Sequence, residues 1–505
     1  MLEATETLPE DPELLKTLAL SLLSENKHLK LLVAKLQRHQ FGRRSESLSI
    51  DQLRLLLGHE TPDDLPEKRK LQPATSVKCK PSRKPLPSHL PREEHRHSVN
   101  SNACEHCGGH LRFVGDDVSE MLEYIPAQFK VIRHVRPKWA CKCCNQIIQA
   151  SAPERPIPQG IAGPDLLAQV LVSKYCDHLP LYRQSQMYAR EGVHLPRSTL
   201  ADWVGKSSTL LSPLVEAIQR HTLGGETVHA DDTPIPVLEP GKGRTKTGRL
   251  WTYVRDERPR QGQAPPAVWF AYTPNRKGKH PQSHLTAFKG IVQADGYAGF
   301  NALYETGGCI EAACMAHVRR KFYDIHVAQT SPQAIQALEY IRQLYQVESA
   351  IRGKPPDERR RCRQHDAAPT LQRFKEWLET TSMQVSRKSE LARAIHYALA
   401  RWVALTRYCD DGRIEIDNNA AERSLRTVAL GRKNYLFAGS DEGGKRAAVL
   451  YSLIGTANLN GLDPMRYLRY VLSVIGSHPI NKIDELLPWN LQKIADHVIQ
   501  TQSAA

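Results

Sequence analysis

The sequence predicts a multidomain α+β protein in which small N-terminal modules precede one larger core of mixed sheet and flanking helices. Three observations support this fold class. The chain has 505 residues, which is enough for three or four domains. Two Cys-x-x-Cys pairs mark a small module near residue 100, and the hydrophobic period changes from helical to alternating after Gly224 and Gly225.

Composition and charge indicate which kind of molecule the protein binds. The chain carries 69 Lys and Arg against 54 Asp and Glu, a net charge of +15, which favours nucleic acid over an acidic membrane surface. No run reaches the roughly 18 apolar residues of a membrane span, and the stretch 467–475 is interrupted by Arg469 and is expected to be a buried helix. The acidic start lacks a signal-peptide pattern, and the eleven cysteines cluster as in reduced metal sites. We therefore expect a cytoplasmic, nucleoid-associated protein with no membrane partner.

The first predicted module, residues 1–48, contains a leucine-rich helix. Leucines at positions 15, 18, 22, 29, 32 and 36 follow the alternating steps of a heptad seam, and Gly42 ends the helix before a basic pair. Both a coiled coil and an amphipathic helix packed on its own chain fit this pattern. Residues 49–97 follow as a basic, Pro-rich linker.

Residues 98–158 predict a zinc-binding domain. Two thiolate pairs with a two-residue gap can wrap one tetrahedral Zn²⁺, and Gly108 and Gly109 permit the tight turn after the first pair. Cys143 and His110 are spare candidates, and the alternative is that these thiols are merely buried. The predicted structural zinc ligands are Cys104, Cys107, Cys141 and Cys144.

Residues 159–222 predict a helix-turn-helix DNA-binding region. A helical run ends near Gly192, and Pro196 opens a second helix that Ser198 can cap. The polar start of such a second helix is where bases are contacted, although any helical hairpin gives this pattern. The candidate DNA contacts here are Arg197, Ser198 and Thr199.

Residues 223–465 predict the core. Three strand-like runs, around residues 226–238, 249–256 and 267–274, precede a helix, and two further strands each run toward a helix. This βββαβαβα order is that of the ribonuclease-H-like fold. A mainly helical, charged stretch, about 325–410, is expected as an all-helical insertion, and 466–505 as a C-terminal tail.

Three carboxylates carry the predicted chemistry. Asp231 and Asp295 lie in or just after strands, and Glu422 lies on the first turns of a helix for which Asp417 is the expected N-cap and Asn418 a neighbour on the same side. Strand alternation allows only one of Asp231 and Asp232 to face a metal. Three converging acids repel one another unless a cation neutralises them, and Mg²⁺ or Mn²⁺ suits oxygen ligands. The basic residues expected to hold DNA phosphates are His317, Arg319, Arg320, Arg423, Arg426, Arg432 and Lys433.

Four sequence blocks resemble the insertion sequence 66 family of bacterial transposases: HADDTP, QADGYAGFNALYE, CMAHVRRKF and DNNAAERSLRTVALGRKNYLFAGSDEGG. The layout is similar too, from FGRRSE after the leucine-rich helix to SHPINKIDELLPWN near the C-terminus. The resemblance implies Asp231, Asp295 and Glu422 as a catalytic DDE triad, with Asp231 preferred over Asp232, and the four cysteines as zinc ligands, although Cys143 could replace one of them.

The resulting hypothesis is a DDE transposase, a metal-dependent polynucleotidyl transferase. It would cut DNA at the terminal inverted repeats of its element and join the 3′-hydroxyls to target DNA, with two Mg²⁺ activating the nucleophile and stabilising the leaving oxygen. A homo-oligomer, paired by the leucine seam, and companion proteins of the same element are expected partners. The alternatives are a DNA-binding regulator with an idle core and a ribonuclease-H-like nuclease without strand transfer.

Overall fold

The computed structural model describes residues 155–158, 160–329 and 331–491, five isolated positions before residue 133, and the backbone of two short strands. These strands, β1 (Lys138–Ala140) and β2 (Ile147–Gln149), pair antiparallel. The predicted leucine-rich helix, the linker and the candidate zinc ligands Cys104, Cys107, Cys141 and Cys144, with Cys143, lie outside the described residues. Within the described part of the chain, no helix has the length and apolar character needed to cross a membrane.

Three helices precede the sheet: α3 (Pro164–Tyr175), α4 (Leu181–Arg190) and α5 (Arg197–Leu223). The turn between α4 and α5 contains Gly192 at a φ of 80°, a conformation that glycine adopts without strain. The predicted capping role of Ser198 is wrong. Pro196 is the N-cap of α5 and no side chain caps the helix, because Ser198 is the second residue of the helix and a capping side chain must stand at the residue before the helix.

The core is a five-stranded mixed sheet, which confirms the predicted combination of mixed sheet and flanking helices. The strands are β3 (Thr227–Leu238), β4 (Thr245–Arg255), β5 (Ala267–Thr273), β6 (Ile291–Ala294) and β7 (Ile310–Ala313). Their order is β5-β4-β3-β6-β7. The pairs β5–β4 and β4–β3 are antiparallel, whereas β3–β6 and β6–β7 are parallel.

The two faces of the sheet carry different neighbours. Thr252 of β4 faces α14 (Asn419–Gly431), where its hydroxyl lies 2.8 Å from the Ser424 hydroxyl. We name this the Asp231 face, because Asp231 pairs with Thr252 in the ladder. The opposite face, named for Asp232, carries Trp251, which packs on aromatic rings of α6 (Lys279–His284) and η2 (Ala298–Phe300).

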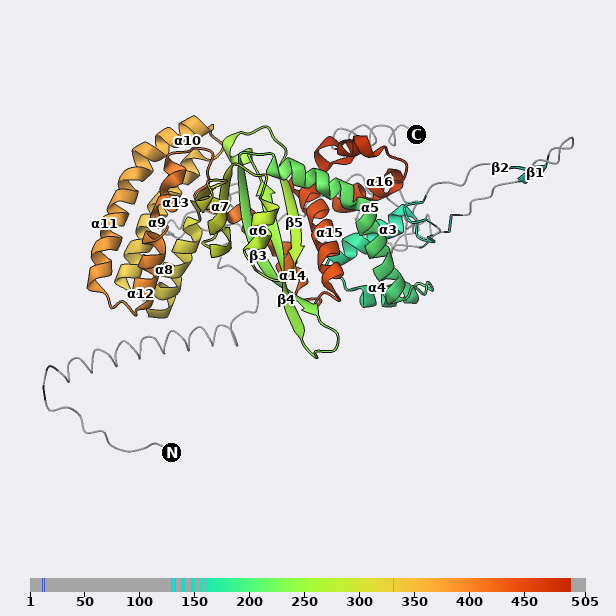
Figure 1. Cartoon of the computed structure of the whole chain (residues 1–505), viewed down its shortest axis with the longest axis horizontal. Helices are drawn as coiled ribbons and strands as arrows, with labels where there is room; N and C mark the ends of the chain where they lie inside the picture. The colour runs from blue at the N-terminus through green and yellow to red at the C-terminus, as the bar shows by residue number, and fades with distance from the viewer. Residues whose placement is uncertain are drawn as a thin grey trace, which may run out of the picture. The chain divides into compact units, whose positions relative to one another are not determined.

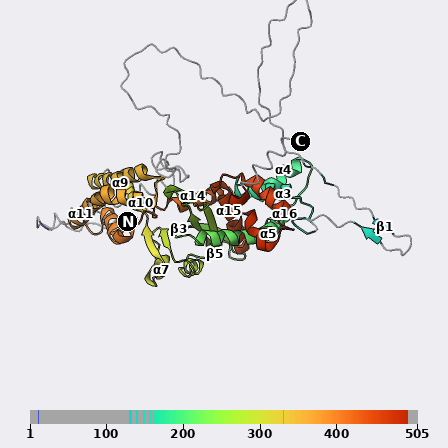
Figure 2. The same cartoon turned by 90° about the horizontal axis from the view of Figure 1, so that it is seen from above.

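A helical segment connects the last strand to α14. After β7 the chain forms α8 (Met315–Gln329), α9 (Pro332–Ile351), α10 (Pro356–Cys362), η3 (Arg363–Ala367), α11 (Ala368–Gln384), α12 (Glu390–Leu399), α13 (Trp402–Thr406) and η4 (Arg407–Cys409). These helices gather beyond the β7 side of the sheet (Figure 1, Figure 2). Their shared core includes Phe322, Ile341, Phe374, Leu378 and Ile395, all buried.

The C-terminal helices close the other side of the sheet. Helix α15 (Asp441–Leu459) lies along the edge strand β5 (Figure 1), where the hydroxyls of Ser452 and Thr456 accept hydrogen bonds from the backbone N–H groups of Phe270 and Val268. An edge strand otherwise leaves such groups unpaired. The predicted buried helix near residue 470 is confirmed as α16 (Pro464–Val474), which packs against α3, and η5 (Ile480–Leu486) follows and contacts α5.

Candidate active site

The strand register brings Asp231 and Asp295 together. Strands β3 and β6 run parallel, with His229 opposite Gln293 as the last pair. Two residues further along each strand are Asp231 and Asp295, so both lie on the face that His229 and Gln293 share. Strand β6 ends at Ala294, and the Asp295 carboxylate accepts a hydrogen bond from the backbone N–H of Tyr297 at 3.1 Å. The two aspartates therefore meet where β6 stops beside β3.

Helix α14 is fixed along the part of β3 that β6 leaves unpaired. At its start, the Asn418 amide donates a hydrogen bond to the Ala230 carbonyl at 2.9 Å and contacts the ring of His229 at 3.1 Å. At its end, Arg432 donates to the Pro234 carbonyl at 2.9 Å. With both ends of the helix bound to one strand, the first turn of α14 and its Glu422 lie over the Asp231 face.

The helix start differs from the prediction by one residue. Asn418, not Asp417, is the N-cap, and α14 begins at Asn419, although an Asp417 oxygen does accept the Asn419 backbone N–H at 3.1 Å. Asn418 does not share an open helix face with Glu422. It is fully buried, because both of its amide atoms are used to hold β3.

The carboxylates repel one another. Burial, followed by the negative charges of Asp295 and Glu422, raises the pKa of Asp231 well above its ordinary value. Among the described residues, no basic side chain forms an ion pair with Asp231. An oxygen-preferring divalent cation would relieve this repulsion, so the donor set fits Mg²⁺ or Mn²⁺.

Asp232 is in the opposite situation. Its carboxylate, 2% exposed, lies on the other face of β3, where Arg249 donates to it at 2.9 Å and Arg276 at 2.8 Å. Arg276 also lies 3.7 Å from Asp295 and 4.0 Å from the ring centroid of Tyr297. Two arginines thus neutralise Asp232, whereas acids surround Asp231.

Glu422 has one paired and one unpaired oxygen. Its Oε2 lies 3.3 Å from the Arg320 guanidinium, and its Oε1 lies 3.7 Å from Nδ1 of His317. Neither Oε1 nor Nδ1 has a hydrogen-bond partner among the described residues, although both atoms are buried. The thiol of Cys314 completes a group whose possible ligand atoms lie within 4.8 Å of one another.

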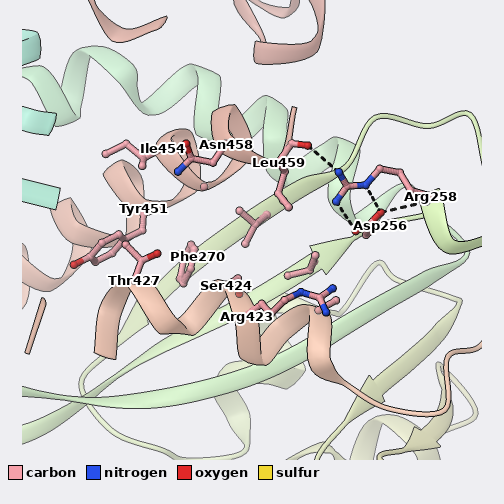
Figure 3. A pocket seen from close by; sticks show the side chains of 14 residues that line it. Asp256, Arg258, Phe270, Arg423, Ser424, Thr427, Tyr451, Ile454, Asn458 and Leu459 are labelled. Carbon is pink, nitrogen blue, oxygen red and sulfur yellow. Dashed lines mark hydrogen bonds and ion pairs between the residues drawn. The ribbon is translucent and has the colours of Figure 1, made fainter. Parts of the chain in front are cut away.

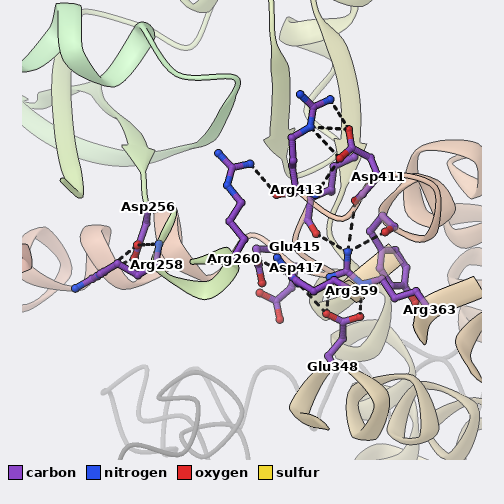
Figure 4. Close-up of polar contacts among 12 residues, drawn as sticks. Asp256, Arg258, Arg260, Glu348, Arg359, Arg363, Asp411, Arg413, Glu415 and Asp417 are labelled. Carbon is purple, nitrogen blue, oxygen red and sulfur yellow. Dashed lines mark hydrogen bonds and ion pairs between the residues drawn. The ribbon is translucent and has the colours of Figure 1, made fainter. Parts of the chain in front are cut away.

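A buried ionic network holds the chain that leads into α14 (Figure 4). We name Glu348, Arg359, Arg363 and Glu415 the arginine cluster. Arg363, fully buried, lies 2.6 Å from a Glu348 oxygen, and Arg359, 2% exposed, lies 2.8 Å from Glu415. Burial acts in the opposite direction, but Arg359 and Arg363 hold the pKa of Glu415 below its usual value. The positive and negative charges of this cluster balance.

Backbone contacts extend from the arginine cluster to the sheet. Arg363 donates to the Tyr408 and Ile414 carbonyls, both at 2.9 Å, and the Gln293 amide on β6 donates to the Asp417 carbonyl at 2.8 Å. Burial raises the pKa of Asp417 to about 7. The helical segment therefore helps to set the position from which α14 starts.

The predicted DNA-contacting residues lie at three places: the start of α5, helix α8, and helix α14 with the residues that follow it. Arg197 and Ser198 are exposed at the start of α5, with Thr199 partly exposed, and Arg423, Arg426 and Lys433 are exposed on or just after α14. His317, Arg319 and Arg320 lie on α8, and His317 and Arg320 face Glu422. Arg432 is committed to the Pro234 carbonyl.

A cavity of about 250 Å³ lies between α14 and α15, over β4 and β5 (Figure 3). Its wall includes Arg423, Ser424, Phe270 and Asn458, and Asp256 at its rim is paired with Arg258 at 2.7 Å. None of the three predicted carboxylates lines this cavity. The carboxylates instead lie on the β3 side of α14.

Sequence reasoning missed several residues that shape the site. Cys314, Arg276 and the arginine cluster received no role, and Asn418 was expected to share a side with Glu422 rather than to hold β3. Two signals were present: the pair of asparagines at the start of α14, and a cysteine three residues before His317, a spacing that brings two side chains together at a helix start. Nothing in the sequence distinguished Arg359 and Arg363 from neighbouring surface arginines.

Comparison of the sequence with known proteins identifies the family to which the chain belongs. The family model described as transposase IS66 family matches residues 159–446, more than half of the chain. The chain belongs to the IS66 family of transposases. Further IS66 models match around this region: the zinc-finger binding domain of transposase IS66 at residues 101–145, the IS66 C-terminal element at residues 452–489, and a model described as transposase C of IS166 homeodomain at residues 28–94.

Two relatives are similar to this chain over most of their length. The chain is 40% identical over 493 residues to the uncharacterized protein y4hP of Sinorhizobium fredii, covering 92% of this chain and 89% of the relative. It is 39% identical over 513 residues to the uncharacterized protein y4jD of the same organism, covering 98% and 99%. The similarity to these two relatives thus extends beyond the core to nearly the whole chain.

Proposed function

We propose that this IS66 family protein is a DDE polynucleotidyl transferase that cuts DNA at the ends of its element and joins the freed 3′-hydroxyls to target DNA. The observation that carries the proposal is the convergence of Asp231, Asp295 and Glu422 on one face of the sheet, where no basic side chain of the described residues pairs with Asp231. The strand order β5-β4-β3-β6-β7, in which only β4 runs opposite to the other four strands, supports a ribonuclease-H-like core.

Asp231, Asp295 and Glu422 would hold Mg²⁺ or Mn²⁺, and Asp231 is preferred to Asp232 because Asp232 faces away and is already neutralised. When bound, such ions lower the pKa of the attacking hydroxyl and stabilise the leaving oxygen of an in-line phosphoryl transfer. The chain's own residues position these donors. Asn418 holds the start of α14 against β3, and Arg320 orients one oxygen of Glu422.

DNA would approach the site across basic side chains. Arg423 and Arg426 are exposed on α14 beside Glu422, Lys433 follows the helix, and Arg319 and Arg320 belong to α8. Cations so placed can hold the backbone phosphates on either side of the scissile bond. The exposed start of α5, with Arg197 and Ser198, is proposed to read the terminal inverted repeats together with the zinc-finger domain.

The decisive experiment is a cleavage and joining assay with labelled DNA from the borders of the element, in Mg²⁺ or Mn²⁺. The matched control is Glu422→Gln, which keeps the size of the side chain but removes its charge. Nicks at the element ends together with joined products, both absent in the control, are expected. Nicks without joined products would instead identify a nuclease, and equal cutting by the control would exclude Glu422 from the site.

DNA binding without cutting would point to a regulator with an idle core, or to a missing companion protein. Repeating the assay with the neighbouring gene products of the element separates these two outcomes. Cleavage that appears only with a companion supports the transferase. DNA binding that never leads to cleavage contradicts the proposal.

A further inference from the structure

We propose that Cys314, His317 and Glu422 form a binding site for a single transition-metal ion, Zn²⁺ by the chemistry of its donors. Occupation of this site would withdraw Glu422 from the carboxylate site (Asp231, Asp295 and Glu422). Zn²⁺ would therefore inhibit the Mg²⁺-dependent reaction. This inhibitory consequence rests on the proposed function, whereas the binding of the ion does not.

The spacing of the donor atoms suits a small ion. One sulfur, one ring nitrogen and one carboxylate oxygen lie within 4.8 Å of one another, and Nδ1 of His317 is 3.7 Å from Oε1 of Glu422. Zinc bonds of about 2.0–2.3 Å in tetrahedral geometry require donors separated by roughly 3.3–3.8 Å. Small side-chain movements would close the group around Zn²⁺.

Two of the three donor atoms lack any other partner. Nδ1 of His317 and Oε1 of Glu422 are buried without a hydrogen bond in the described part of the chain, whereas the second Glu422 oxygen faces Arg320. A buried polar atom without a hydrogen-bond partner destabilises the fold, because it has lost its contacts with water and gained none in return. A cation between these atoms would satisfy both at once.

The third donor, Cys314, is a buried thiol whose pKa is raised well above its usual value by burial and by the charges of Asp417 and Glu422, so it keeps its proton until a metal ion displaces it. It lies between β7 and α8, directly before the first residue of a 15-residue helix, where the helix dipole favours negative charge. The backbone N–H of Asn418 already donates to its sulfur at 3.1 Å. Hydrogen bonds of this kind orient ligands around a metal ion. On binding, the S–H bond would break, the S–Zn bond would form and the proton would pass to solvent.

The donor types separate this site from the Mg²⁺ site. Sulfur and imidazole nitrogen favour Zn²⁺, whereas Mg²⁺ prefers oxygen and retains its water. Because Glu422 would serve both ions, occupation of one site would weaken the other. Three protein donors would leave one open position on the zinc ion.

The test uses Co²⁺ as a spectroscopic probe of the full-length chain, with the zinc-finger domain filled beforehand by one equivalent of Zn²⁺. A thiolate bound to Co²⁺ gives a charge-transfer band in the near ultraviolet. The critical variant is Cys314→Ser, and the matched control is Cys309→Ser, which changes another buried free cysteine just before β7. Wild type and the control should show the band, and Cys314→Ser should lose it.

A second variant distinguishes the loss of a metal ligand from misfolding of Cys314→Ser. His317→Ala removes a partly exposed ligand, and we expect it to weaken Co²⁺ binding by more than the roughly 10–100-fold caused by the loss of an outer-shell partner. Identical Co²⁺ binding by wild type, Cys314→Ser and His317→Ala would overturn the proposal. This readout needs no DNA, so it stands even if the transferase function fails.

The regulatory consequence is tested separately, by titrating Zn²⁺ into the Mg²⁺-dependent cleavage assay. Each protein is compared with its own rate in Mg²⁺ alone. The Zn²⁺ concentration for half-inhibition should rise at least about tenfold in Cys314→Ser and remain unchanged in Cys309→Ser. Equal inhibition of both variants would place the inhibitory zinc elsewhere in the chain.

Discussion

Two regions of this protein bury acidic side chains, and they treat the charge in opposite ways. In the arginine cluster, two glutamates face two arginines, and the charges cancel within the fold. In the carboxylate site, three acids converge while Asp231 has no basic partner among the described residues. A buried charge balanced by the protein contributes to its architecture, whereas one left unbalanced indicates a missing ligand. The contrast recurs within β3, where Asp232 is paired and Asp231 is not.

The largest expected effect is on DNA cleavage, and it should differ between the neighbouring residues Asp231 and Asp232. Asp231→Asn should reduce DNA cleavage on the order of 10⁴-fold, comparable to the loss of one member of a catalytic group. The same change should raise the melting temperature of the metal-free protein, because it removes a repelled charge. Cleavage rates and thermal unfolding of the purified variant measure both effects.

Asp232→Asn is the matched control for that experiment. It should lower the melting temperature, at a cost of about 1–3 kcal/mol, because Arg249 and Arg276 lose their acidic partner. Its effect on cleavage should be much smaller than that of Asp231→Asn. A reversal, with Asp232→Asn abolishing cleavage and Asp231→Asn tolerated, would show that the assignment of the first carboxylate is wrong.

The next largest effect should come from breaking the balanced region. Arg363→Ala would leave Glu348 buried without its closest partner, at an expected cost of about 3–5 kcal/mol in the free energy of unfolding. Chemical denaturation measures this change. Arg361→Ala, an exposed arginine of the preceding helix, should stay within about 0.5 kcal/mol of wild type. Equal effects of the two changes would contradict a structural role for the cluster.

The pH dependence of stability tests Asp417, which lies in the chain between the arginine cluster and the helix that carries Glu422. Because burial raises its pKa to about 7 in the folded protein, Asp417 takes up protons more readily there than in the unfolded chain. This contribution to stability is complete below about pH 4 and is lost as the pH rises to about 7. Relative to Asp417→Asn, wild type should lose about 3 kcal/mol over that range, measured by chemical denaturation at each pH. A constant difference between the two proteins would show that Asp417 titrates normally.

The smallest expected effect concerns an exposed cation outside both regions. Arg197→Ala at the start of α5 should weaken binding to the element ends and reduce the salt slope of the binding constant by about one. Lys206→Ala is the matched control, because nine residues along a helix place it on the opposite side. Fluorescence anisotropy at several salt concentrations measures both variants, and equal slopes would remove Arg197 from the DNA interface.

The sequence was informative where local pattern determines structure. Alternating β-branched and aromatic residues marked the first three strands, and the placement of Asp295 at the end of a further strand was visible from the sequence. The choice between Asp231 and Asp232 was not, because alternation states only that they face opposite ways. Which face carries the site depends on the pairing with β6 and on α14, which are contacts across long stretches of sequence. The arginine cluster could not be predicted for the same reason. An arginine in a helix with many charged residues is expected to be exposed, and only the contacts of the folded chain show that it is buried.

The contact between α15 and β5 has a consequence for the synthesis of the protein. Strand β5 is made well before Asp441, yet its outer N–H groups at Val268 and Phe270 find their partners only on α15. A nascent or truncated chain that stops before this helix presents an open sheet edge, which readily pairs with other chains and aggregates. Such a fragment would retain α3–α5, so it could otherwise compete with the complete protein for DNA. Because solubility depends on a late helix, the fold itself disfavours the accumulation of incomplete chains.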